Sequence, residues 1–141
     1  MAIARAASSW DDTGKLILRL AVAILMSFHG VSKLKHGIGW MAGPLHAHHF
    51  PMFVGYGVYV AEVVAPVLLI VGIFTRPAAL TIAFDMIMAL VLVVQGGAFE
   101  LQKQGGGLGA EVQFLYLFSA LAIAFLGSGR FALSKGQGRW D

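Results

Sequence analysis

The chain has 141 residues, of which 58% are hydrophobic and 12% charged, with a formal net charge of +3 and a mean hydropathy of +0.79. This balance is too apolar for a soluble domain of the same length and indicates an integral membrane protein. The absence of cysteine excludes disulfides, thiolate metal sites and iron–sulfur ligation. Lys and Arg lie near the ends of apolar segments, which favours lipid headgroups or membrane topology over nucleic acid as the reason for the positive charge.

Four apolar segments account for most of the chain, and each approaches the length that crosses a hydrocarbon layer of roughly 30 Å at 1.5 Å per residue. We predict transmembrane helices at about 15–34, 52–74, 77–99 and 112–128. Only Thr75 and Arg76 separate the second helix from the third, so these two helices form an antiparallel hairpin. The sequence therefore predicts an all-α, integral membrane, four-helix up-down bundle that forms a single domain over residues 1–141.

The distribution of basic residues between the two ends of this bundle predicts its orientation. One end carries Arg5, Lys15, Arg19, Arg76, Arg130, Lys135 and Arg139, and the other carries Lys33, Lys35 and Lys103. By the positive-inside rule both termini are then cytoplasmic, and loops 35–51 and 100–111 face outward. The run Gly105, Gly106 and Gly107 is expected to prevent further regular structure in the second loop.

Loop 35–51 carries four histidines, His36, His46, His48 and His49. Neutral imidazole binds zinc and copper, but no HExxH or Cys–His pattern accompanies these residues. Neighbouring aromatic residues such as Trp40 instead indicate a half-buried interfacial turn. We assign no metal ligand, with metal binding by this loop as the alternative. A transmembrane haem is disfavoured because only His29 lies within a predicted helix.

Ionisable side chains within the predicted spans carry the functional signal, because a charge near the bilayer centre costs ~2.5 to 3.5 kcal/mol. They are Glu62 and Asp85 near mid-membrane, Arg19 in the inner part, His29 in the outer part, and Lys33 and Glu111 at the outer boundary. Small residues recur three, four and seven positions from several of these charges and allow helices to approach closely. We expect the charged side chains to face the interior of the bundle.

Pro66 lies four residues after Glu62 and supplies no N–H to the Glu62 carbonyl, which predicts a kink beside this acid. Such a position would hold a proton, an ion, water or a quinone headgroup, or would only shape packing. If Arg19 pairs with Asp85, the two residues form either an ion pair that fixes the membrane topology or part of a functional site. The presence of Glu62 and His29 in the spans favours a role in ligand binding or proton handling. Glu111 either has a functional role or caps the fourth helix.

Several short motifs occur in a fixed order along the chain. They are Arg19-Leu20-Ala21, Phe28-His29-Gly30-Val31-Ser32-Lys33-Leu34, Ala61-Glu62, Gly72-Ile73-Phe74-Thr75-Arg76, Gly109-Ala110-Glu111 and Gly127-Ser128-Gly129-Arg130. Together, over about residues 16–134, they resemble the DoxX family. The resemblance implies a four-helix, multi-pass protein of the bacterial inner membrane, related to the small membrane subunit of thiosulfate:quinone oxidoreductase. It implies roles for Arg19, His29, Lys33, Glu62, Arg76 and Glu111, whereas Asp85, Pro66 and the loop histidines lie outside the pattern.

These observations predict a membrane subunit of a quinone-linked oxidoreductase that is co-catalytic or non-catalytic by itself. Glu62 and His29 are the expected catalytic proton carriers. The expected quinone-binding residues are Arg19, Lys33, Tyr59, Asp85 and Glu111. The sequence has no flavin, haem or iron–sulfur motif, so electrons would come from other membrane or redox subunits. The alternatives are a structural or assembly subunit of a larger complex, and a small-solute or proton pathway, which would require a homo-oligomer.

Overall fold

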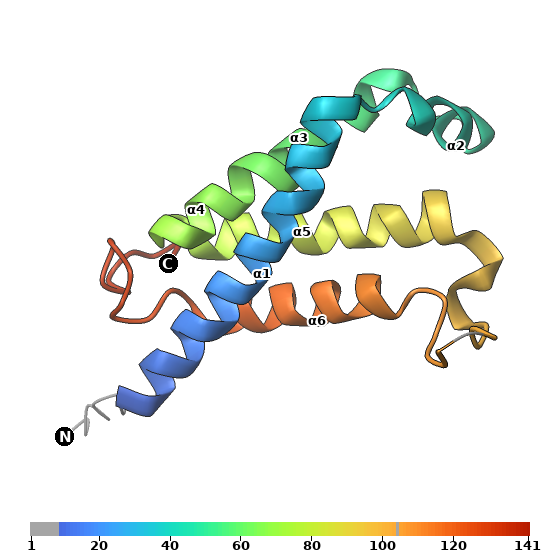
Figure 1. Ribbon diagram of the computed structural model, residues 1–141. Helices are drawn as coiled ribbons and strands as arrows, with labels where there is room; N and C mark the ends of the chain where they lie inside the picture. Colours follow the sequence, from blue (N-terminus) through green and yellow to red (C-terminus); the bar gives the residue numbers. More distant parts are fainter. Residues whose placement is uncertain (1–8, 104) are drawn as a thin grey trace.

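The computed structural model describes residues 9–103 and 105–141, so Arg5 of the predicted N-terminal cations lies outside the described residues. Across the described part, the named elements are all helices. Among the residues that the structure describes, three helices are long and apolar enough to cross a membrane: Ser9–His36, Met52–Val71 and Thr75–Val94. A fourth apolar helix, α6 (Glu111–Leu126), is shorter (Figure 1). The prediction of an all-helical membrane protein is confirmed.

The first span is a single helix, α1 (Ser9–His36), which extends beyond the predicted range 15–34 at both ends. Asp11 and Asp12 lie in its first turn, and its last turn contains Lys33, Lys35 and His36. Acidic groups at the start and basic groups at the end complement the helix dipole, which favours the longer helix. α1 runs beside α4 (Ala65–Val71), crosses α5 and α6 obliquely, and packs against α4 and α6 (Figure 1).

The second span changes helix type several times along its length. It begins with the 3₁₀ segment η2 (Met52–Tyr56) and the short α3 (Gly57–Tyr59), continues as the π-helical turn η3 (Val60–Val64), and ends with α4. Pro66 is the second residue of α4, two positions after the π-helical turn, and this turn is the distortion of the helix found beside Glu62. The span ends before Gly72, which adopts the left-handed conformation, and not at the predicted residue 74.

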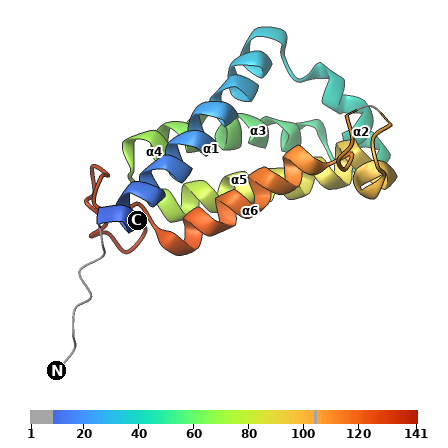
Figure 2. The same ribbon diagram turned by 60° about the horizontal axis from the view of Figure 1, so that its bottom comes forward.

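The third span begins with α5 (Thr75–Ala89) and also contains a π-helical segment, η4 (Leu90–Val94), followed by the 3₁₀ segment η5 (Gln95–Phe99). α4 and α5 pack against each other across the short turn between them, as the predicted hairpin requires. α5 lies alongside α6 over most of the length of α6 (Figures 1 and 2).

Loop 35–51 contains more regular structure than predicted, whereas the described part of loop 100–111 contains one isolated bridge. Loop 35–51 contains the 3₁₀ segment η1 (Gly39–Met41) and the short helix α2 (Ala42–Ala47). In loop 100–111, Leu101 and Leu108 form an isolated antiparallel bridge, and the Gln102 N–H donates to the Gly107 carbonyl at 3.0 Å. Among the described residues of this loop, no helix or strand forms before α6 begins at Glu111, as expected from the glycine run. Gly105, Gly106 and Gly107 all have positive φ and reverse the chain between the bridged residues.

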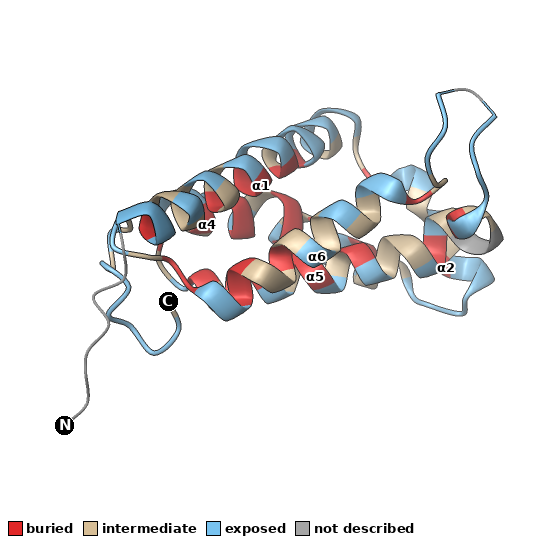
Figure 3. Ribbon diagram, turned by 90° about the horizontal axis from the view of Figure 1, so that it is seen from below, coloured by how far each residue is buried: buried red, intermediate tan, exposed pale blue. Residues whose placement is uncertain are grey.

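The core consists of small and aliphatic side chains from all four apolar helices. It contains Val22, Ala23 and Met26, Ala65 and Leu69, Ala78, Ala79, Ile82, Ala83 and Met86, and Ala120, Ile123 and Ala124. Buried positions lie on the helix faces turned toward one another, and large apolar side chains such as Phe84 and Phe125 remain 63% and 80% exposed (Figure 3). Exposed apolar surface on this scale is suited to contact with lipid.

Candidate functional site

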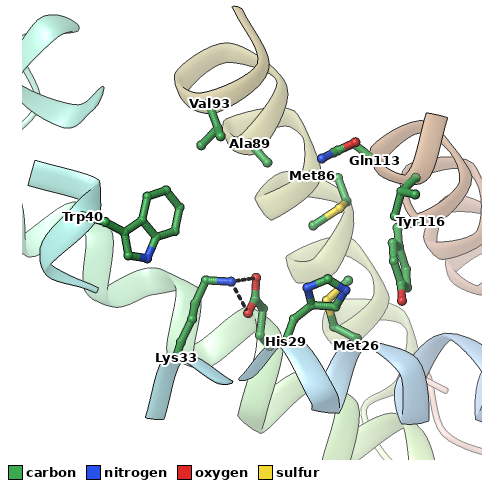
Figure 4. A pocket seen from close by; sticks show the side chains of 11 residues that line it. Met26, His29, Lys33, Trp40, Met86, Ala89, Val93, Gln113 and Tyr116 are labelled. Atoms are coloured by element: carbon green, nitrogen blue, oxygen red, sulfur yellow. Dashed lines mark hydrogen bonds and ion pairs between the residues drawn. The ribbon is translucent and has the colours of Figure 1, made fainter. Parts of the chain in front are cut away.

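A buried ion pair joins the first two spans. Glu62 on the π-helical turn η3 is only 4% exposed, and the Lys33 ammonium donates to both of its carboxylate oxygens, at 2.7 and 2.6 Å (Figure 4). Removing such charges from water costs several kcal/mol per ion unless good geometry offsets the loss. The contact of one ammonium with both oxygens meets that condition and holds α1 against the second span.

The backbones of the two spans touch one turn before Lys33. A Cβ atom at Gly30 would overlap the backbone carbonyl of Glu62 and the Val63 side chain, so only glycine fits. This carbonyl is the group to which Pro66 cannot donate an N–H, and it lies against the Cα of Gly30. The close approach brings the Lys33 side chain within reach of the Glu62 carboxylate.

A cavity of about 150 Å³ lies beside the ion pair. α1 contributes Met26, His29 and Lys33 to its lining, and α6 contributes Val112, Gln113 and Tyr116 (Figure 4). Met86 and Ala89 come from α5, Val93 from η4, Glu62 from η3, and Trp40 from η1 in loop 35–51. All four apolar helices and loop 35–51 therefore contribute. The lining combines one ion pair, an imidazole and an amide with methionine, aromatic and aliphatic side chains, which is the composition expected of a small-molecule site.

His29 shares this cavity with Glu62 but does not bond to it. Its ring stands edge-on to Tyr116 of α6, with centroids 5.9 Å apart and an interplanar angle of 89°. The sequence grouped Glu62 with His29 for binding or proton handling, and in the structure the direct ion-pair partner of Glu62 is Lys33. The longer lysine side chain reaches the carboxylate from one turn away, whereas the imidazole lies toward α6. The three residues are nevertheless brought to one cavity, as the sequence suggested.

Tyr59 and Asp85 lie on the periphery of the ion pair. The Tyr59 hydroxyl donates to the Lys33 carbonyl at 3.3 Å, and its ring stacks on Tyr56. Asp85 lines a smaller cavity of about 60 Å³ that also borders Lys33, Trp40 and Glu62. Neither Tyr59 nor Asp85 lines the cavity of about 150 Å³.

Arg19 lies far from this cavity. It is 1% exposed, and its guanidinium donates to the backbone carbonyls of Ser128 at 3.3 Å and Phe131 at 2.9 Å. It precedes Lys33 by 14 residues on the same helix, a separation of about 21 Å. The ion pair with Asp85 that the sequence left open is not formed. Ser128 is the last residue of the fourth predicted span and Phe131 lies beyond it, where hydropathy gives no signal for their position.

Glu111 is the first residue of α6, is exposed, and lies beside Gly107. A carboxylate at a helix N-terminus is favoured by the helix dipole, which matches the capping alternative. Its neighbours Val112 and Gln113 line the cavity, and Glu111 does not.

The histidine loop contributes an aromatic residue to the cavity. Among residues 9–103 and 105–141, no three His, Asp or Glu side chains gather closely enough to hold a metal ion. Trp40, interpreted from the sequence as an interfacial residue, lines the cavity instead. Sequence reasoning also missed Gln113 and Tyr116. Their signal was available, because they are polar side chains on an otherwise apolar helix face.

Comparison with known proteins assigns the chain to a family. The DoxX family model matches residues 14–95, which include Lys33, Glu62 and Asp85. An uncharacterized protein of Haemophilus influenzae is 34% identical over 121 residues, covering 84% of this chain and 86% of the relative. No solved structure matches the chain. The chain belongs to the DoxX family of membrane proteins.

Proposed function

We propose that the cavity beside Lys33 and Glu62 binds the ring of a quinone, and that the protein is a membrane subunit of a quinone-linked oxidoreductase. The observation that carries this proposal is the combination of a charged pair and an imidazole with an apolar, aromatic lining in one cavity of about 150 Å³. A cavity of roughly this volume accommodates a benzene-sized ring.

A neighbouring apolar groove supports the proposal that the bound molecule has an apolar tail. It measures about 350 Å³ and is lined by Leu18, Ala21, Val22 and Leu25 of α1 and by Val112, Leu115, Tyr116 and Ser119 of α6. Val112 and Tyr116 line both this groove and the cavity. A polar cavity that adjoins an apolar groove suits a lipid-soluble quinone, whose ring carries the oxygens and whose tail is hydrocarbon.

The side chains of the cavity can hold and move the protons that such chemistry requires. A bound quinone supplies reversible chemistry in which two electrons and two protons are taken up together. The Lys33 ammonium would bind a ring oxygen and favour negative charge on it, while Glu62 keeps the ammonium in place. Glu62 and His29 would exchange protons with the bound ring. The electrons would come from a partner subunit that carries a flavin, haem or similar donor.

The same proposal places the protein in the bacterial inner membrane with four spans and cytoplasmic termini. α6 is shorter than the other spans, at about 24 Å from 1.5 Å per residue. It packs along α5 and is apolar after its first turn apart from Tyr116 and Ser119, which supports its inclusion as the fourth span. The excess of Lys and Arg at the end that carries Lys15, Arg76 and Arg130 supports the orientation.

Quinone retention tests the proposal. In protein purified with native lipid, Glu62→Gln and His29→Ala are each expected to lower the copurified quinone roughly tenfold or more, because each removes a polar contact to the ring. Glu100→Gln and His46→Ala are matched controls, since both residues are exposed and lie outside the cavity. Chromatographic measurement of quinone per protein gives the result. Equal quinone in the variants and their controls would contradict the proposal.

A structural or assembly role is the second candidate, and one observation favours it. Lys33 and Glu62 neutralise each other completely, so the ion pair serves equally well as a link between helices. If this is its role, the variants would lose assembly with a larger complex while their quinone content stays unchanged. Proton flux through liposomes containing this chain alone would instead indicate a pathway.

A further inference from the structure

A second charged cavity lies at the end of the molecule opposite Lys33. It measures about 280 Å³ and forms where the starts of α1 and α5, the end of α6 and the C-terminal segment (residues 127–141) meet (Figure 2). It is lined by Asp12, Lys15, Arg76, Leu126, Ser128, Gly129, Arg130, Lys135, Gly136 and Asp141. The proposed quinone site does not include any of these residues.

The charges around this cavity are predominantly positive. Its side chains include four cations, Lys15, Arg76, Arg130 and Lys135, and two acids, Asp12 and Asp141, so their formal charge is +2. Asp12 is already engaged, because it accepts from the backbone N–H of Arg130 at 3.2 Å and lies 3.4 Å from the Arg130 guanidinium. Within the described residues, the ammonium groups of Lys15 and Lys135 have no hydrogen bond or ion pair. The cavity therefore offers two unengaged cations.

The segment that forms one wall of the cavity is fixed in place. Its backbone accepts both hydrogen bonds from Arg19, and the Leu133 N–H donates to the Val71 carbonyl at 3.1 Å. The Arg76 N–H donates to the Trp140 carbonyl at 2.9 Å. The cavity is thus lined by an anchored segment and not by a free tail.

Lys135 itself adopts a costly backbone conformation. Its φ of 55° lies in the left-handed region, which non-glycine residues rarely occupy. Such strain persists only where the surrounding structure imposes it, and it clusters at ligand sites. Here it holds a lysine on the wall of a cavity that already has a net positive charge.

We infer that this cavity binds a phosphate group, either that of an anionic phospholipid or a free phosphate ion. Arginine and lysine are the side chains that bind phosphate oxygens in proteins. The cavity lies at the ends of the apolar helices, where the headgroups of a bilayer are found, and basic pockets at this level bind anionic lipids. A bound phosphate would join the start of α1, the α4–α5 turn and the C-terminal segment.

The double variant Lys15→Gln/Lys135→Gln tests this inference. Binding of phosphatidylglycerol to the purified protein in neutral detergent is measured by native mass spectrometry, with diacylglycerol as the probe that lacks phosphate. In a second arm, inorganic phosphate is added and the thermal unfolding midpoint is followed. Loss of two cations is expected to weaken phosphatidylglycerol binding roughly 30-fold. Lys35→Gln/Lys103→Gln is the matched control, since it makes the same charge change at exposed positions outside this cavity.

The two arms distinguish the source of the phosphate. Stabilisation by inorganic phosphate that the test variant loses would support a site for the free ion. A lysine-dependent effect of phosphatidylglycerol alone would support a lipid site. Equal binding of phosphatidylglycerol by the test and control variants, with equal responses to inorganic phosphate, would overturn the inference.

Discussion

Lys33→Met is expected to lower the free energy of unfolding by about 3 to 5 kcal/mol, because Glu62 would then be buried without its partner. Glu62→Gln leaves the Lys33 ammonium without a charged acceptor and is expected to destabilise the protein in the same way. The double variant removes both charges and should be more stable than Lys33→Met alone. Reversible unfolding in bicelles gives the three free energies and hence the coupling between the residues.

Lys35→Met provides the matched control on the same helix, since Lys35 is exposed and two residues away. Its effect is expected to stay within about 0.5 kcal/mol, as for ordinary surface substitutions. Additive losses in the double variant would show that Lys33 and Glu62 do not depend on each other, and would contradict the ion pair described above.

Gly30→Ala is expected to destabilise the protein by about 1 to 3 kcal/mol or more, because the added methyl group would overlap the Glu62 carbonyl and the Val63 side chain. The two spans would have to move apart, and the Lys33 ammonium would move away from the Glu62 carboxylate. Lower quinone retention should therefore accompany the loss of stability, although Gly30 does not line the cavity. The free energy of unfolding and the quinone content are measured on the same preparation.

Gly14→Ala makes the same chemical change in the same helix where a Cβ meets nothing within 4 Å. Alanine is the better helix former by about 1 kcal/mol, so this control should be unchanged or slightly stabilised. If Gly30→Ala behaved like Gly14→Ala, the close approach of α1 to Glu62 would not be required.

Hydropathy predicted the apolar helices because the thickness of the hydrocarbon layer sets how many consecutive apolar residues a spanning helix needs. The ends were less well predicted, since the polar first turn of α1 at Asp11 and Asp12 carries no hydrophobic signal. Pro66 predicted a kink beside Glu62, but neither the π-helical turn found there nor the close approach of Gly30 to it has a local sequence signal. The second π-helical segment, Leu90–Val94, contains no proline and had no local signal.

The cavity was predicted in part. The cost of a charge in lipid predicted that Glu62 is buried. The up-and-down order of the helices predicted that Glu62 and His29 lie in the same bundle interior. Its choice of Lys33 over His29 could not be predicted, because side-chain length and rotamer decide which group reaches the carboxylate. Trp40 comes from a loop whose fold is not set by periodicity. Arg19 binds carbonyls of the C-terminal segment, and backbone acceptors have no sequence signature.

Photolabelling tests the central claim most directly. A photoreactive benzoquinone with an apolar tail, activated in native membranes and mapped by peptide mass spectrometry, should attach to cavity-lining residues such as Met26, Met86 and Tyr116. Excess natural quinone should remove these labels, and Glu62→Gln should reduce them. Competed labels found only on residues outside the cavity, or labelling unaffected by natural quinone, would contradict a quinone site beside Lys33 and Glu62.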